Sequence, residues 1–539
     1  MSGVGTLIRL ILRRDRIKLP VWIGGFLLSL IAMVPLLQDV YGDKESLATV
    51  YATFNANPAG MFMTGPMDEP TFGAFMALET LLWWGMAIAF LNTLLVVRHT
   101  RHNEEIGAQE LLLSGRVHRS SSLIAALTVS LAVNALIVLG LGIGLQAVDA
   151  PWSASQSWLY AVAIGLFGFV WAALAAVVVQ LVESGRTANA ALAGLVGLGF
   201  LIRGIGDFLG KVDTSGVHQP EWMSGLSPFG WLQATRPLTS GYDWWPLAVL
   251  AGFSIIMIGL GFVLLVRRDV GAGILPSVQG NARASRALGS PVGLALYLHK
   301  NIFVGWLVAV LVMVGTIGVL VPQMSDIYTS SDSMRQMIES IGGAGALIPS
   351  FMSAMIAIVC VMIIGYAIHS LSRVRSEESS GRLEGLLATR LSRLKWLGSH
   401  AAATVVGSLI MLVATGLFLA VCVNGLSDIR VDIGEYVLAG LSYAPVVWVF
   451  VALYLLVFGY VPRLTGFVWA YFGFVAFALW LGPIVQLDQV IMNLSLMEHI
   501  ATPPAEDVRL APILTLTGLA LVLAGLGMFG FSRRDTQAG

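Results

Sequence analysis

Long apolar runs alternate with short polar segments along almost the whole chain. A helix of about 20 residues crosses a hydrocarbon layer of about 30 Å, and the runs are of that length. The pattern therefore predicts an all-α integral membrane protein with about twelve transmembrane helices. The expected spans lie near residues 19–38, 74–97, 121–146, 158–182, 188–209, 244–266, 302–322, 349–371, 398–423, 436–460, 466–486 and 511–531.

Composition supports this interpretation and excludes several function classes. The 539 residues are 57% hydrophobic and only 12% charged, whereas soluble domains carry about 25% charged residues. The formal net charge is zero, so no charge bias indicates nucleic acid as a partner. Cys360 and Cys422 fall in or near different apolar runs, where they are expected to act as small hydrophobes and not as a disulfide or metal site.

Lysine and arginine positions predict the orientation in the membrane. Residues 4–18 place Leu7, Leu10 and Ile11 near one helical face, which indicates an interfacial amphipathic helix before the first span. With the N-terminus inside, inner segments hold 24 of the 31 lysines and arginines. The positive-inside rule then places both termini in the cytosol.

A polar segment occurs twice at equivalent places, each time between two apolar runs. Its copies are residues 101–119 and 375–393, and they align without a gap. The positions that agree are Arg101/Arg375, Glu104/Glu378, Gly107/Gly381, Glu110/Glu384, Leu112/Leu386, Leu113/Leu387, Arg116/Arg390 and Arg119/Arg393. The same charge bias places both copies in the cytosol.

The repeat extends over the two halves of the chain. Spans six and twelve both end in Arg-Arg-Asp, at residues 267–269 and 533–535. Because each half has an even number of spans, the halves must run parallel, related by an axis along the membrane normal. The expected domains are a first half at 1–269, a cytoplasmic linker at 270–292 and a second half at 293–539. Segments 43–54 and 331–340, each after the first span of a half, are expected to form short outer helices.

Two interpretations of the repeated segments remain open. Glycine suits the start of a helix, and Glu110 and Glu384 at the third position can reach back to a free backbone N–H. The glutamates would then only cap a surface helix. Alternatively, Glu104, Glu378 and the flanking arginines contact a cytosolic partner, while the paired leucines anchor a short helix to the membrane domain.

The repeated segments resemble those of membrane subunits of ATP-binding-cassette type-2 exporters. The fused two-by-six layout resembles the polyketide-antibiotic and multidrug exporter permeases of actinobacteria. The supporting stretches are LSPFGW (226–231), RRDVGAG (267–273), GRLEGLLATRLSR (381–393) with Ser399-His400, and the terminal RRD (533–535). The chain departs from the pattern at LSLMEH (494–499) and at NEEIGAQE, which lacks an arginine directly after Gly107.

The resemblance implies a permease in the bacterial cell membrane that exports small hydrophobic or amphipathic compounds. Each half would begin with an amphipathic lead, and the N-terminal amphipathic helix would be the elbow helix. Each repeated segment would be a cytoplasmic coupling helix between the second and third spans of its half. Two copies of a separate ATP-binding-cassette ATPase would dock on these coupling helices and bind the ATP and Mg. This chain itself would carry no cofactor, and membrane lipid would surround its spans. Consistent with this, residues 204–212 (GIGDFLGKV) lack the spacing of a P-loop.

Polar and aromatic residues inside the spans are candidates for a substrate path. Phe75, Glu79, Trp83 and Met86 share one face of span two at helical spacing. Asn92 and Asn134 are further candidates, although intramembrane asparagines more often join helices than bind ligand. A snorkelling or protonated Glu79 is the competing interpretation.

Other intramembrane groups have simpler interpretations. Arg203 and Asp207 lie four residues apart and are expected to pair with each other. The histidines His99, His102 and His118 flank only one loop, so neither a metal site nor a catalytic residue is expected. The competing function is an ion-coupled twelve-span secondary transporter, which would need buried carboxylates near the bilayer midplane. A polytopic membrane enzyme would need clustered His, Asp or Glu at one depth.

Overall fold

The structure is a computed structural model that describes residues 3–41, 44–56, 58–115, 117–212, 218–275, 283–330, 344–426, 430–481 and 487–535. Within these ranges, 12 helices are long and apolar enough to cross a membrane, and the regular structure is otherwise helical apart from one pair of two-residue strands. The prediction of an all-α membrane protein with about twelve spans is therefore confirmed. The chain forms two compact units, Met1–Gly280 and Asn281–Gly539.

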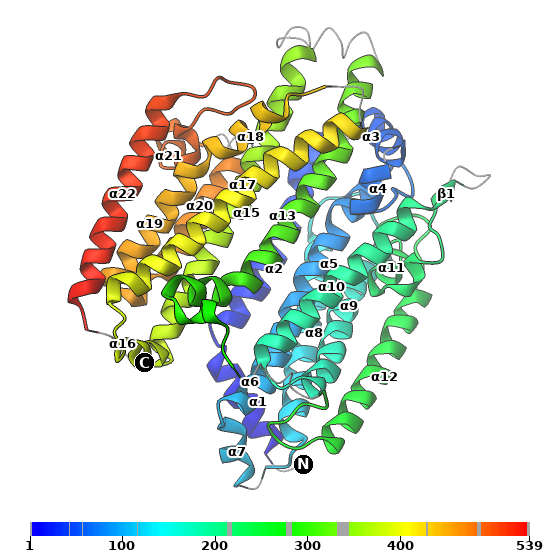
Figure 1. The fold of residues 1–539 in the computed structure, drawn as a ribbon. Coiled ribbons are helices and arrows are strands. Elements are labelled where there is room, and N and C mark those ends of the chain that lie inside the picture. The colour runs from blue at the N-terminus through cyan, green and yellow to red at the C-terminus, as the bar shows by residue number, and fades with distance from the viewer. Residues whose placement is uncertain are drawn as a thin grey trace. The chain divides into compact units, whose positions relative to one another are not determined.

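The first unit contains six of the spanning helices (Figure 1). Its elements are α1 (Val4–Arg14), α2 (Lys18–Tyr41), α3 (Lys44–Ala56), α4 (Pro58–Thr64), α5 (Phe72–His99), α6 (Arg101–Glu105), α7 (Ala108–Leu113), α8 (Ser121–Ala147), α9 (Ala154–Leu181), α10 (Gly185–Phe208), β1 (Lys211–Val212), β2 (His218–Gln219), η1 (Ser224–Leu226), α11 (Pro228–Gln233) and α12 (Trp245–Arg267).

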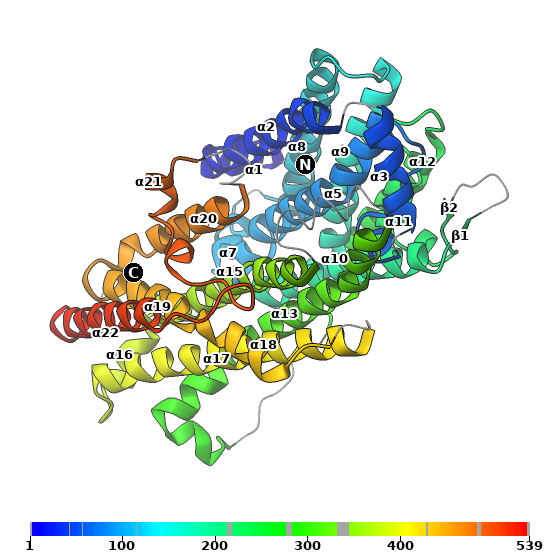
Figure 2. The same ribbon diagram turned by 90° about the horizontal axis from the view of Figure 1, so that it is seen from above.

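Helix α9 is the centre of this unit, with α5, α8 and α12 packed against it (Figure 2). It is the most buried span of the unit, because Phe167, Trp171 and its many alanines all face neighbouring helices. Helix α8 approaches α2 closely at glycines: a Cβ on Gly140 would lie 2.5 Å from Leu27, and one on Gly144 would collide with Ile31. Small residues thus allow these helices to pack without a hydrophobic driving force between them.

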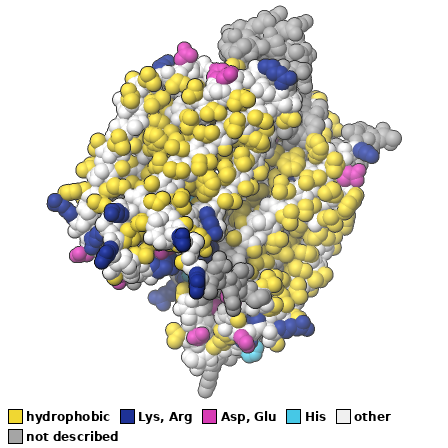
Figure 3. Space-filling model, in the orientation of Figure 1, with side chains coloured by type: hydrophobic (Ala, Val, Ile, Leu, Met, Phe, Trp, Pro, Cys, Tyr) yellow, Lys and Arg dark blue, Asp and Glu magenta, His cyan; other side chains and the backbone are white. Residues whose placement is uncertain are grey.

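The second unit contains the other six spanning helices. Its elements are η2 (Arg286–Gly289), α13 (Pro291–Ser330), α15 (Ala344–Ser379), α16 (Arg382–Leu387), α17 (Arg393–Leu426), α18 (Ile433–Ser442), α19 (Ala444–Tyr460), η3 (Pro462–Leu464), α20 (Gly466–Leu481), α21 (Gln489–Met492), η4 (Leu496–His499) and α22 (Leu510–Arg533). Helix α19 packs against α15 and α22, and α13 packs against α17. Apolar side chains cover the visible faces of the spans, and charged side chains lie toward their ends (Figure 3).

The second unit departs from the sequence-based expectation in two places. The tenth span, expected to be continuous, is divided at Tyr443 into α18 and α19. Pro445 explains the break, since a proline lacks the N–H that an uninterrupted helix needs and suits the first turn of a new one. The amphipathic lead of this unit is not a separate helix, because α13 runs without interruption from Pro291.

The first unit does have a separate lead helix. In α1, Leu7 and Ile11 are buried, whereas Leu10 is exposed. The short helix expected at 43–54 is present as α3. Its expected counterpart at 331–340 lies outside the described residues.

Candidate functional site: the two repeated loops

Each repeated loop contains a short helix that begins at a glycine. Gly107 precedes α7 with φ 73° and ψ −1°, and Gly381 precedes α16 with φ 73° and ψ −2°. This left-handed conformation is disfavoured for residues with a Cβ, so glycine is required at this turn. The predicted helix starts are confirmed, and the backbone turn is nearly identical in both units.

In the first unit, the loop is tied to the end of the sixth span by one carboxylate. Arg268 follows α12 and donates to Glu104 through two nitrogens, at 2.5 Å to Oε1 and 2.9 Å to Oε2. Arg101 donates to the same carboxylate at 2.5 Å, and Gln180 of α9 accepts from Arg268 Nε at 2.7 Å. The pair is largely removed from solvent, with side chains 3% and 10% exposed. Such bidentate charge-assisted bonds fix geometry as well as adding energy.

The second unit repeats this connection with its own residues. Arg534 follows α22 and donates to Glu378 at 2.5 Å to Oε1 and 2.7 Å to Oε2. A second contact is also duplicated: Arg119 donates to the backbone carbonyl of Arg268, and Arg393 to that of Arg534. Two of the predicted loop positions in each unit therefore hold the loop against the end of the last span.

Apolar contacts hold the short helices from the other side. Leu112 packs against the core of the first unit, and Leu386 and Leu387 pack against that of the second. The most buried position differs between the units. It is Gln109 in α7, whose amide oxygen accepts from Ser122 Oγ at 2.8 Å, and the fully buried Leu383 in α16.

The opposite face of each short helix remains exposed. Glu110 and Glu384 both point to solvent, and in the described part of the chain neither carboxylate has a hydrogen-bond or ion-pair partner. The expected capping bond back to the backbone is not formed. Leu111 is 78% exposed beside Glu110. Arg390 is also exposed, and Arg116 lies outside the described residues.

Among the candidates for a substrate path, the two asparagines bond to each other. Asn134 Nδ2 donates to Asn92 Oδ1 at 2.7 Å, and Asn92 Nδ2 donates to Asn134 Oδ1 at 3.2 Å. Ser130 of α8 donates to the same Asn92 oxygen at 2.5 Å. Both amides are buried, and their hydrogen bonds join α5 to α8.

The other four candidates lie on α5 but do not share one environment. Phe75 is buried against Tyr41, with ring centroids 4.8 Å apart, and Glu79 and Met86 are half-buried. Trp83 is exposed and lines an apolar cavity of about 450 Å³ between α2 and α5. The structure thus places Trp83 alone of the four at a described cavity.

The expected pair on span five is present and fully buried. Arg203 Nη1 lies 3.1 Å from Asp207 Oδ2, and both side chains are 0% exposed. Asp207 also accepts from Ser224 Oγ at 3.0 Å, and Arg203 donates to the carbonyl of Met63 at 3.1 Å. The pair therefore fastens α4 and η1 to the end of α10.

Comparison with known proteins gives the family. A family model described as "Multidrug efflux system permease Rv1217c, C-terminal domain" matches residues 5–265 and 288–532, one stretch in each unit. The multidrug efflux system permease protein Rv1217c of Mycobacterium tuberculosis is 31% identical over 548 aligned residues, covering 99% of this chain and 96% of the relative. The chain belongs to this multidrug efflux permease family.

An efflux permease needs a path for its substrate and a conformational change that opens this path, and it does not need a reactive centre. Within the described ranges, no three His, Cys, Asp or Glu residues come together in a way that would hold a metal ion. Sequence reasoning missed Arg268 and Arg534 as partners of the loop glutamates. The signal was present, because Arg-Arg-Asp recurs in both halves together with the loop motif.

Proposed function

We propose that this chain is the permease subunit of an ATP-driven exporter, energised by a separate ATP-binding-cassette ATPase. One ATPase copy, with its ATP and Mg, docks on each repeated loop. The cargo is hydrophobic or amphipathic, as in antibiotic and multidrug export. The observation that carries the proposal is the duplicated attachment of each loop to the last span of its unit, which leaves one face of α7 and of α16 free for a partner.

The attachments give a route from a docked partner to the spans. A push on α7 reaches α12 through Glu104 and Arg268, and a push on α16 reaches α22 through Glu378 and Arg534. A bidentate ion pair resists sliding better than a contact between flexible apolar side chains. Closure of an ATPase dimer would therefore move both last spans together with the loops and reopen the path to the other side of the membrane.

The test is co-purification of the permease with the ATPase encoded beside it. The variant carries Glu110→Arg and Glu384→Arg, two exposed positions at which substitution leaves the core intact. The matched control carries Asp149→Arg and Asp507→Arg, which reverse two exposed carboxylates outside the loops. We expect the wild type and the control to retain the ATPase and the loop variant to lose it.

Other outcomes have distinct meanings. If the loop variant binds the ATPase as well as the wild type, the docking surface is not formed by these glutamates. If no version binds an ATPase and transport collapses with the proton or sodium gradient, the ion-coupled transporter replaces this proposal.

A further inference from the structure

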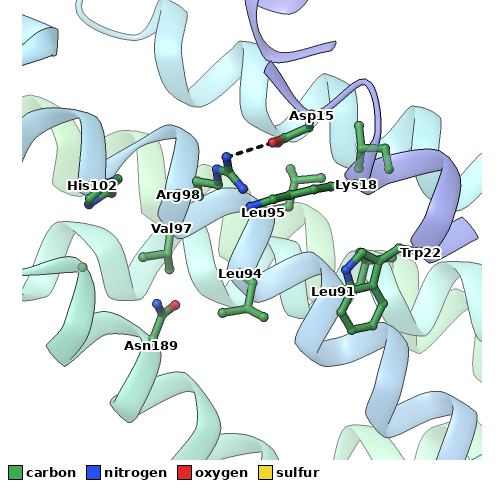
Figure 4. Close-up of a pocket in the computed structure, with 12 residues that line it drawn as sticks. Asp15, Lys18, Trp22, Leu91, Leu94, Leu95, Val97, Arg98, His102 and Asn189 are labelled. Atoms are coloured by element: carbon green, nitrogen blue, oxygen red, sulfur yellow. Dashed lines mark ion pairs between the residues drawn. The ribbon is translucent and has the colours of Figure 1, made fainter. Parts of the chain in front are cut away.

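A cavity of about 370 Å³ lies within the first unit, between α2, α5 and α10. It sits where α2 begins, α5 ends and α10 begins, which is the end of the unit that carries the first repeated loop (Figures 1 and 4). Its lining combines charged and apolar side chains. Neither the loop contacts nor the candidates on α5 account for it.

The charges at this cavity favour an anion. Arg98 lies 3.1 Å from Asp15, whose other oxygen is 2.5 Å from His99 Nε2. Lys18 is exposed, has no carboxylate partner among the described residues, and extends toward Arg98 in Figure 4. Arg98 is thus paired with Asp15, and Glu105 accepts from the backbone N–H of Gly185, at another part of the wall, at 3.2 Å. In the described part of the chain, the Lys18 ammonium is left without a carboxylate partner, and a cation of this kind attracts phosphate or carboxylate groups.

A polar group also lacks a partner at the cavity wall. The side-chain oxygen assigned to Asn189 of α10 is buried and, among the described residues, has no hydrogen-bond partner. Figure 4 shows this amide directed toward Leu94 across the cavity. Leaving a buried amide atom unsatisfied destabilises the folded protein. A ligand that brought a hydroxyl group to this position would donate a hydrogen bond to this oxygen and remove that destabilisation.

The remaining wall suits hydrocarbon. Trp22 and Leu94 are 48% and 46% exposed, and Leu91 lies beside them. A free inorganic anion would bind the cations but would leave the apolar side chains of this wall exposed. We propose that this cavity binds an anionic amphiphile, whose phosphate or carboxylate is held by Lys18 and Arg98 and whose chain lies against Trp22 and the leucines. The inference goes beyond the proposed function and does not depend on ATP coupling.

The second half lacks the same charges. Alignment of Trp22 with Trp306 puts Ile302 at the place of Lys18, and alignment of the repeated loops puts Ser372 at the place of Arg98. The two cations of this cavity are therefore not repeated at the aligned positions of the second half.

The experiment uses the full-length permease purified in a neutral detergent. Thermal unfolding and native mass spectrometry are recorded while phosphatidylglycerol, phosphatidylcholine or inorganic phosphate is added. The test variant is Lys18→Ala. The control is Arg16→Ala, which removes an exposed cation two residues away that does not line the cavity. Both positions are exposed, and circular dichroism verifies the fold.

For the wild type, we expect phosphatidylglycerol to raise the unfolding temperature and to be retained with one selective lipid per chain. One cation near an anionic headgroup changes binding about fivefold, so Lys18→Ala should weaken the response by about that factor while Arg16→Ala leaves it unchanged. The proposed site would be wrong if phosphatidylcholine raised the unfolding temperature as much as phosphatidylglycerol. It would also be wrong if Lys18→Ala and Arg16→Ala weakened the response to phosphatidylglycerol equally. A full response to inorganic phosphate alone would overturn the amphiphile and leave a simple anion site.

Discussion

Glu378 and Arg534 lie 156 residues apart in the sequence and meet through two hydrogen bonds of 2.5 and 2.7 Å. The guanidinium also stacks over Phe458 and Phe531, at 4.9 and 5.1 Å from the ring centroids. Glu104 and Arg268 make the equivalent contact in the first unit. Arginine can serve in both because its planar fork matches a carboxylate and its face stacks on aromatic rings.

The first prediction concerns this pair in the second unit. Glu378→Ala leaves the Arg534 guanidinium largely buried without its carboxylate, which should lower the free energy of unfolding by about 2–4 kcal/mol. The double variant Glu378→Ala with Arg534→Met should recover most of this loss, because no charge is then left unpaired. Thermal unfolding of the purified protein measures both effects.

A matched control comes from the same loop. Glu384→Ala removes an exposed carboxylate without a partner among the described residues, so it should change stability by no more than about 0.5 kcal/mol. If Glu378→Ala proves as mild as Glu384→Ala, the ion pair does not hold the loop.

Features that depend on local pattern could be predicted from the sequence. The spans follow from the length of the apolar runs, the helix starts at Gly107 and Gly381 from a glycine followed by a glutamate at the third position, and the pair of Arg203 and Asp207 from their spacing of four. Each of these involves residues within a few positions of one another, where geometry is set by the helix itself.

Features that depend on distant residues could not be predicted in the same way. The loop glutamates were open to an interpretation as partner contacts, because nothing local indicates that Arg268, 164 residues away from Glu104, would return to it. Likewise, the sequence alone could not show whether Asn92 faces a substrate path or bonds to Asn134. In both arrangements the amide lies on a helix inside the membrane.

The second prediction tests the role of the asparagine pair. Asn92→Leu removes the bonds to Asn134 and Ser130, and should cost about 1–2 kcal/mol of stability, since interhelical hydrogen bonds in membranes are individually modest. Resistance to each drug should fall in proportion to the amount of folded permease, with no change in drug preference. The control Thr128→Val removes a hydroxyl that bonds only its own helix, and should have little effect. A selective change in drug preference in Asn92→Leu would assign this residue to the path instead.

The third prediction concerns the ion pair at the end of α10. Asp207→Ala leaves Arg203 completely buried without a counter-charge, which should cost about 3–5 kcal/mol. Ser224→Ala removes only one neutral donor to the same carboxylate, and should cost about 1 kcal/mol. Unfolding temperatures measured at equal detergent concentration show which of the two variants is less stable. Equal effects of the two variants would mean that the pair is hydrated and not buried.

The last prediction is a pH dependence centred on Asp68, which lies between α4 and α5, outside the spans. Burial raises the pKa of Asp68 from 3.8 to about 6, although Arg236, with Nε 3.5 Å from the carboxylate, lowers it and Glu69 raises it further. At pH values between 3.8 and about 6, Asp68 therefore keeps a proton in the folded protein that it has released in the unfolded chain. This residue's contribution to stability is fully present below the unfolded pKa of 3.8 and is lost as the pH rises to about 6.

Asp68→Asn should remove this dependence because an amide does not ionise. We expect the variant to unfold at a higher temperature than the wild type at pH 7.5, and the difference to shrink as the pH falls toward 4. Asp149→Asn replaces an exposed carboxylate of the same unit, and its unfolding temperature should differ little from that of the wild type at any pH. Thermal unfolding at a series of pH values decides the matter. A difference between Asp68→Asn and wild type that stays constant with pH would show that Asp68 ionises in the folded protein as it does in the unfolded chain.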